Sequence, residues 1–143
     1  MRAVSFAILL FATSAVGDDG SARAKLIGRW KPQESAAKEA GVWTLEAKNG
    51  DILRVTHSLG DQKLSELECS TTGRECEIKD SGKTAKVSMW FNGAKLVELE
   101  TKGREVVKRR FAVAKQGDTL EVEIIPIVPE GRPETLRFAR TQR

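Results

Sequence analysis

The segment Leu26-Ile27-Gly28-Arg29-Trp30 decides the predicted fold of this chain of 143 residues. It is the first apolar stretch after an N-terminal leader, and we expect residues 26–31 to form the opening strand of a small antiparallel barrel. A glycine two residues before a tryptophan lets neighbouring backbone pass close by, while the indole lies flat across one end of the barrel. The indole N–H then needs an acceptor. The rest of the chain is expected to return to this end as successive hairpins.

The N-terminus has the pattern of a secretory signal peptide. Met1-Arg2 supplies a positive charge, residues 3–12 are apolar, and Ala15-Val16-Gly17 has the small residues of a cleavage site. We therefore expect a signal peptide at residues 1–17 and a single domain at residues 18–143. No stretch approaches the roughly 20 apolar residues of a membrane-spanning helix. Because the first cysteine is Cys69, lipid attachment at the cleavage site is excluded, and the product should be exported, periplasmic or secreted, and not a lipoprotein.

The two cysteines, Cys69 and Cys76, predict a disulfide bond. An even count at close spacing in an exported chain favours a bridge, and Thr71-Thr72-Gly73-Arg74 between them has the composition of a turn. A bridge over so short a loop contributes about 2–3 kcal/mol. His57 is the single histidine, so two thiols and one imidazole leave a zinc ion short of ligands. No metal or cofactor is expected.

The charges are mixed along the chain. Lys and Arg number 24 against 20 Asp and Glu, giving a net charge of +4 without basic blocks. This distribution favours solubility and lacks the clustered basic residues that are typical of nucleic-acid-binding proteins. With 31% charged residues and no tyrosine, the chain also disfavours a transmembrane β-barrel, which requires apolar outer bands with aromatic girdles.

Alternation with a period of two begins at residue 42. Before it, residues 18–24 are expected to be a loose polar lead-in, and residues 33–40, between Pro32 and Gly41, are the only predicted helical stretch, with an irregular loop as the alternative. Trp43 and Leu45 alternate with polar residues on one strand and Leu53 and Val55 on the next, and all four are expected on one face. A three-residue loop at residues 48–50 would pair Trp43 with Val55 and Leu45 with Leu53.

Turn signals divide the remaining chain into further short strands. The predicted segments are residues 64–69, 76–79, 84–91, 96–101, 105–115, 119–128 and 135–140. Around Asn92-Gly93 two registers stay open, one pairing Met89 with Leu96 and the other Val87 with Val97. Pro126 predicts that the strand at residues 119–128 bends near Ile125. The whole pattern predicts an all-β, antiparallel up-and-down barrel of about 8–10 short strands, with at most one short helix after the first strand.

Gly28 and Trp30 on the first strand, with Arg140 on the last, give the chain a resemblance to the lipocalin and fatty-acid-binding-protein (calycin) superfamily. It is most similar to small, uncharacterised, bacterial exported lipocalin-like proteins. The resemblance implies that Arg140 packs over the indole of Trp30 at the closed end, a contact worth about 0.5–2 kcal/mol. These three residues would close the barrel and would not bind ligand. The chain departs from the fatty-acid-binding proteins in having at most one of the two short helices that cap them.

A barrel of this size is either filled by side chains or holds one small ligand. The predicted ligand-lining residues are Trp43, Leu45, Leu53, Val55, Val87, Met89, Phe111, Val113, Leu120, Val122, Leu136 and Phe138. Alternation also turns Arg109 inward, and the resemblance suggests that it anchors a ligand anion. The alternatives are that the apolar residues only fill a core, and that Arg109 lies on a bulge or pairs with an internal Glu. His57 is expected to be a packed residue.

No catalytic arrangement is found, and we expect no enzyme activity. The first functional hypothesis is a binding module for a small apolar or amphipathic molecule, including an anionic one. The second is an envelope interaction or inhibitor protein with a packed core, whose loops bind a protein partner.

Overall fold

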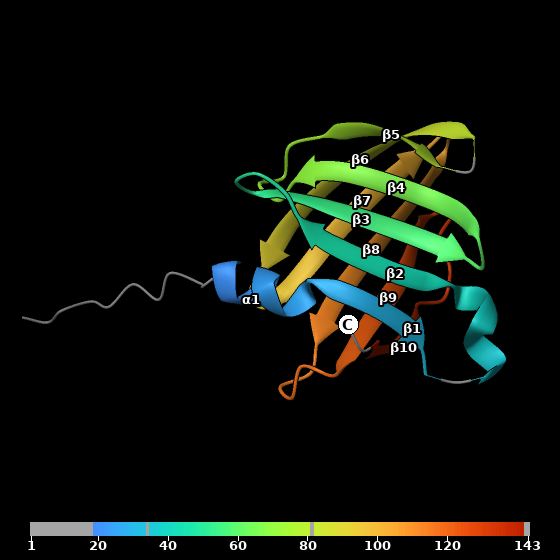
Figure 1. Ribbon diagram of the computed structural model, residues 1–143. Coiled ribbons are helices and arrows are strands. Elements are labelled where there is room, and N and C mark those ends of the chain that lie inside the picture. Colours follow the sequence, from blue (N-terminus) through green and yellow to red (C-terminus); the bar gives the residue numbers. More distant parts are fainter. Residues whose placement is uncertain (1–18, 34, 81, 142–143) are drawn as a thin grey trace, which may run out of the picture.

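The computed structural model describes residues 19–33, 35–80 and 82–141, and the predicted signal peptide lies outside them. Ten antiparallel strands form one closed barrel, in which each strand pairs with its neighbours in sequence and β1 pairs with β10 (Figure 1). The strands are β1 (Gly28–Pro32), β2 (Val42–Ala47), β3 (Ile52–Leu59), β4 (Gln62–Ser70), β5 (Cys76–Asp80), β6 (Lys83–Asn92), β7 (Lys95–Lys102), β8 (Glu105–Val113), β9 (Thr119–Val128) and β10 (Glu134–Arg140). The predicted all-β up-and-down barrel is confirmed.

The hairpin of β2 and β3 has a different register from the predicted one. Trp43 pairs with His57 and Leu45 with Val55, a shift of two residues. The Lys48 N–H donates to the Ile52 carbonyl at 2.9 Å, so the ladder extends to Lys48 and the loop comprises residues 49–51. A shift of two keeps every side chain on the same face, so the apolar pattern does not distinguish the two registers.

Both registers considered for the hairpin of β6 and β7 are wrong. Asn92 pairs with Lys95, which makes Gly93-Ala94 the two-residue loop and places Met89 opposite Glu98. Gly93 has a positive φ of 61°, which a residue without Cβ adopts without strain. The turn therefore begins one residue later than expected, and Glu98 lies on the inner face of the sheet.

A helix replaces the expected loose lead-in. Helix α1 spans Asp19–Leu26, and the strand that was predicted from residue 26 begins at Gly28. Ala22 and Leu26 are buried, and Arg23 donates hydrogen bonds to the carbonyls of Gly50 and Ile52. Contacts to the barrel thus stabilise this helix, which explains why local propensity did not predict it.

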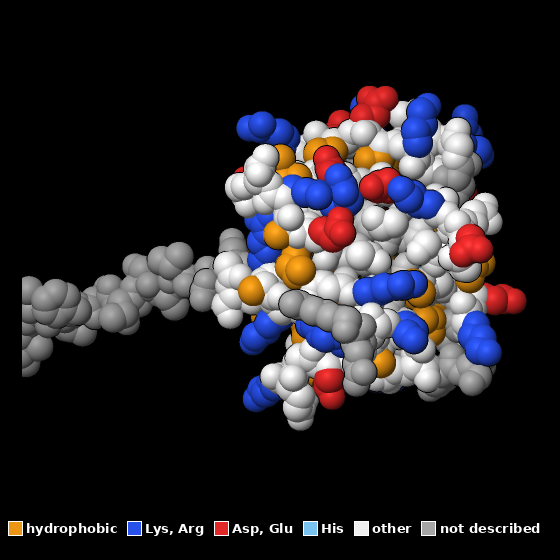
Figure 2. Space-filling model, in the orientation of Figure 1, with side chains coloured by type: hydrophobic (Ala, Val, Ile, Leu, Met, Phe, Trp, Pro, Cys, Tyr) orange, Lys and Arg blue, Asp and Glu red, His pale blue; other side chains and the backbone are white. Residues whose placement is uncertain are grey.

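The predicted helical stretch after the first strand forms the 3₁₀ helix η1 (Ser35–Ala40). No helix within the described ranges is long and apolar enough to span a membrane. On the face shown in Figure 2, Lys and Arg side chains are interspersed with Asp and Glu and do not form a single-sign patch.

The expected irregularity near Pro126 lies where β8 and β9 pair. The register shifts between Val106, which pairs with Val128, and Val107, which pairs with Pro126. Proline cannot donate to a ladder, so a bulge at this point accommodates it.

Candidate functional site

The closed end of the barrel is built around Arg140. Its guanidinium carbon lies 4.2 Å from the centroid of the Trp30 ring. Nη1 donates to the Ile27 carbonyl at 2.6 Å, Nη2 to the Lys25 carbonyl at 2.7 Å, and Nε to the Gly117 carbonyl at 2.9 Å. The Arg140 side chain therefore links β10 to residues 25–27, just before β1, and to the turn between β8 and β9.

Gly28 and Trp30 complete this end. Gly28 has a φ of 142°, and a Cβ there would lie 2.5 Å from Nη1 of Arg140. The indole Nε1 of Trp30 donates to the Leu26 carbonyl at 3.0 Å, which satisfies the donor that burial would otherwise leave unpaired. The position of Arg140 over Trp30 is the one that the resemblance implied, and a closing role for these three residues stays a prediction.

The principal apolar candidates for ligand binding lie on the inner face of the barrel and are buried. Trp43, Val55, Met89, Phe111 and Phe138 all belong to one core cluster. Their position is compatible with both a ligand-lining and a core-filling role, so ligand binding at these side chains stays a prediction.

Arg109, the charged candidate, points into the barrel as predicted and forms an internal ion pair. Its Nη1 lies 2.7 Å from Oε1 of Glu98 and 3.5 Å from Oε2 of Glu100. The Arg109 side chain is 19% exposed, and those of Glu98 and Glu100 are 2% and 9% exposed. The anion-anchor hypothesis for Arg109 stays a prediction, since the guanidinium already pairs with two carboxylates through Nη1.

The inner charges extend toward the open end of the barrel through Asp80 and Lys102. Lys102 Nζ lies 3.4 Å from Oδ2 of Asp80. Burial, followed by a hydrogen bond with Asp80, raises the pKa of Glu100 to about 7. Within the described ranges, no grouping of three or more His, Cys, Asp or Glu side chains is arranged to hold a metal ion.

Sequence reasoning missed Glu98 and Glu100 because β7 is apolar on both faces. Leu96 and Val97 are buried on opposite faces, and the carboxylates alternate with Val97 and Leu99 as they would on a solvated strand. The available signal was Arg109: a buried guanidinium requires a carboxylate, and a neighbouring strand is where it would be found.

His57 is a packed residue that positions η1. Its ring stacks on Trp43 with centroids 4.1 Å apart and an interplanar angle of 3°. Nε2 donates to the Ala40 carbonyl at 2.6 Å, which assigns the proton to that nitrogen, and burial lowers the pKa of His57. The neighbouring Gly41 has a φ of 74°, and a Cβ there would lie 2.8 Å from Nε2.

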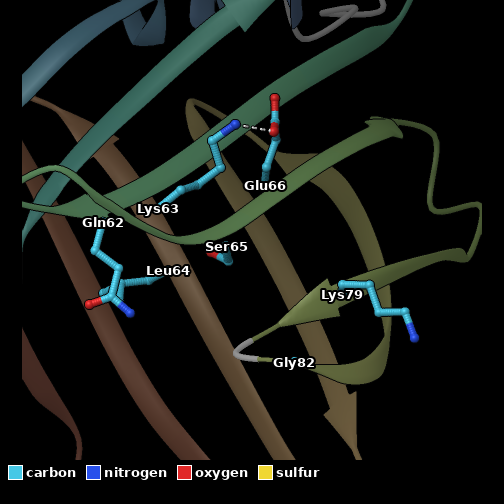
Figure 3. Close-up of a pocket in the computed structure, with 7 residues that line it drawn as sticks. All are labelled: Gln62, Lys63, Leu64, Ser65, Glu66, Lys79 and Gly82. Atoms are coloured by element: carbon cyan, nitrogen blue, oxygen red, sulfur yellow. Dashed lines mark hydrogen bonds and ion pairs between the residues drawn. The ribbon is translucent and has the colours of Figure 1, made fainter.

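A cavity of about 550 Å³ lies at the open end, beside the first half of β4 and the turn that follows β5 (Figure 3). The two strands pair at Ser65 and Asp80, and the disulfide of Cys69 and Cys76 joins them farther along. The cavity is lined by Gln62, Lys63, Leu64, Ser65, Glu66, Lys79 and Gly82. Since Ser65 pairs with Asp80, one of the inner charged residues, this cavity borders the charged region of the lumen.

The closed ten-stranded meander has the same fold as barrels of the fatty-acid-binding-protein type. The resemblance predicted from the sequence is confirmed at the level of fold. No protein-family model matches the chain, and no curated protein matches it.

Solved structures of this type are similar to the whole barrel. The Schistosoma mansoni fatty acid binding protein, in complex with arachidonic acid, superposes with a TM-score of 0.68 and 15% identity over 85% of this chain and 99% of that one. Lipid binding protein 8 of Caenorhabditis elegans gives 0.65 and 11%, over 82% and 96%. Secretory abundant heat soluble protein 4 of Ramazzottius varieornatus gives 0.65 and 14%, over 82% and 96%. At these identities the likeness establishes the fold.

Proposed function

We propose that this chain is an exported barrel that binds a small apolar or amphipathic molecule in its lumen. The leader pattern at residues 1–17 and the disulfide support export, because such bridges persist in oxidising compartments. After cleavage, residues 18–143 would form a single released domain. Binding is favoured over catalysis because His57, the single histidine, is held as a packed residue: its ring stacks on Trp43 and its Nε2 donates to the Ala40 carbonyl.

The observation that carries this proposal is the cavity of about 550 Å³ beside the first half of β4 and the turn that follows β5. Its volume lies within the range of small-molecule sites. It borders the lumen at Ser65, and beyond the charged residues lie buried apolar side chains such as Met89 and Phe111. An amphipathic molecule matches this arrangement, because its polar end would contact the charged residues and its apolar end the buried side chains.

Structural neighbours support the same class of ligand. One is described as a fatty acid binding protein in complex with arachidonic acid, and another as a lipid binding protein. An anionic ligand would contact Arg109 on the inner face, where Nη1 already binds Glu98 and Glu100.

The test is native mass spectrometry of the full chain purified from its own host, followed by titration of the emptied protein with an uncharged apolar fluorophore. We expect a co-purified small molecule and saturable binding. Ser65→Trp, which narrows the cavity, should weaken binding, whereas Thr135→Trp puts the same indole on an exposed site of β10. A protein that carries nothing and binds no fluorophore would contradict the proposal, as would equal binding by the two variants.

An interaction protein is the second candidate, and exposed apolar residues at the open end favour it. Leu59 is 38% exposed, Ile127 42% and Val128 48%. Odd-numbered strands run in the same direction, so the ends of β3 and β9 lie at the same end of the barrel. If this rim binds a protein, Ile127→Asp should abolish a specific complex formed in the host envelope while leaving luminal binding of the fluorophore intact.

A further inference from the structure

The inner wall of the barrel carries more acidic than basic groups. Asp80, Glu98 and Glu100 face the lumen from β5 and β7, opposed by Arg109 and Lys102. Lys102 binds Asp80 toward the open end, so deeper in the lumen a single guanidinium serves two carboxylates. The pKa of Glu100, raised to about 7 by burial and by its hydrogen bond with Asp80, is consistent with this local surplus of acid.

One of these carboxylates has an unused acceptor. Oε1 of Glu98 receives the hydrogen bond from Arg109, whereas its buried Oε2 has no hydrogen-bond partner. Buried polar atoms in proteins are nearly always paired, and an ionised carboxylate only accepts hydrogen bonds. The group that completes this site must therefore be a donor.

We propose, on the basis of the binding function proposed above, that the ligand of this barrel carries a hydrogen-bond-donating head group, a hydroxyl, amide or amine, that binds Oε2 of Glu98. A ligand carboxylate would instead bring a third acid to a guanidinium that already has two. The charged lumen thus selects neutral or cationic amphipathic molecules over fatty acids.

The position of Glu98 defines how such a ligand lies. Glu98 pairs across the sheet with Met89 on one side and Arg109 on the other, at the border between the charged and apolar regions of the lumen. The next inward residue toward the closed end is Leu96, which pairs with Phe111. The head group would reach Glu98 past Asp80 and Glu100, and the apolar chain would lie against the buried residues beyond.

Three probes with the same chain test the head group directly: 1-decanol, decylamine and decanoic acid, each titrated calorimetrically into the disulfide-bonded mature protein at neutral pH. We expect the alcohol and the amine to bind about tenfold or more tightly than the acid, as when a buried polar group meets a matched partner. This ranking uses the unaltered protein, so it does not depend on any variant folding.

Glu98→Gln supplies the second measurement, because it removes the charge and keeps the size of the side chain. The affinity for decylamine should fall about tenfold, and the affinity for decanoic acid should rise relative to that for decylamine. Glu121→Gln, at an exposed pair with Arg137 on the outer face, should change neither. Tightest binding by decanoic acid would overturn the head-group assignment while leaving luminal binding intact. An unchanged ratio of decylamine to decanoic acid affinity in Glu98→Gln would do the same. Failure of all three probes and of the uncharged fluorophore would overturn the proposed function as well.

Discussion

Arg140 lies over the face of Trp30, with its guanidinium carbon 4.2 Å from the ring centroid, and thereby joins the last strand to the first. The strands themselves already pair, with Trp30 opposite Arg140 in the ladder of β1 and β10. The side-chain contact adds three bonds to backbone carbonyls that the ladder does not use. The Arg140 side chain therefore adds contacts between the two ends of the barrel to those of strand pairing.

Arg140→Gln should destabilise the protein by about 2–4 kcal/mol, since it removes the cation–π contact and most of the hydrogen bonds to carbonyls. The free energy of unfolding, from urea titration, measures this. Arg137→Gln is the matched control on the same strand, because Arg137 and its partner Glu121 are 61% and 49% exposed. Such a surface pair is worth at most about 1 kcal/mol. Equal losses in the two variants would contradict a closing role for Arg140.

Gly28→Ala should also destabilise the barrel, by about 1–3 kcal/mol for the strained backbone alone. The added Cβ would lie 2.5 Å from Nη1 of Arg140, so the guanidinium must also shift away from Trp30. In Gly103→Ala the φ of 61° is unfavourable too, but the Cβ meets nothing within 4 Å. A larger loss of stability for Gly28→Ala than for Gly103→Ala, in the same urea titration, is the expected result.

Replacing both Cys69 and Cys76 by serine should lower the free energy of unfolding by about 2–3 kcal/mol, because the short loop they close is no longer restrained in the unfolded chain. A reducing agent should produce a comparable loss in the unaltered protein. It should have no effect on the double variant, and any further loss there would show that reduction acts elsewhere.

The strands and the inner face could be predicted because they depend on local patterns. Alternation of Trp43, Leu45, Leu53 and Val55 indicates one buried face in either register, and it also turned Arg109 inward. Register could not be derived in the same way. Shifting a hairpin by two residues preserves every face, so only the loop geometry decides, and that depends on hydrogen bonds such as Lys48 to Ile52.

The acidic partners of Arg109 could not be predicted from local patterns. On β7, Val97 and Glu98 are both 2% exposed although they lie on opposite faces, so hydrophobicity does not indicate which face is inner. The helix α1 was missed for a related reason: its stability comes from burial of Leu26 and from bonds of Arg23 to the turn between β2 and β3. In both cases the deciding partner is distant in sequence.

The raised pKa of Glu100 makes stability depend on pH in a defined direction. Its pKa is about 7 in the folded protein, against an ordinary value of 4.5, so the fold favours the protonated carboxyl. The stabilisation from that proton is fully present below pH 4.5 and is lost as the pH rises through about 7. The groups that face Glu100 are Asp80, Glu98 and Arg109, and ionising it adds a third negative charge beside one guanidinium.

Glu100→Gln, which mimics the protonated form, should therefore be nearly neutral at about pH 5 and increasingly stabilising toward about pH 8. Thermal unfolding of both proteins across this range measures the difference. Burial lowers the pKa of His57, which costs stability as the pH falls, but this acts on both proteins and cancels in the comparison. Glu121→Gln, on the outer face, should show no such pH-dependent gain. A difference between Glu100→Gln and the unaltered protein that stays constant with pH, or grows toward acid, would contradict a pKa of about 7 for Glu100.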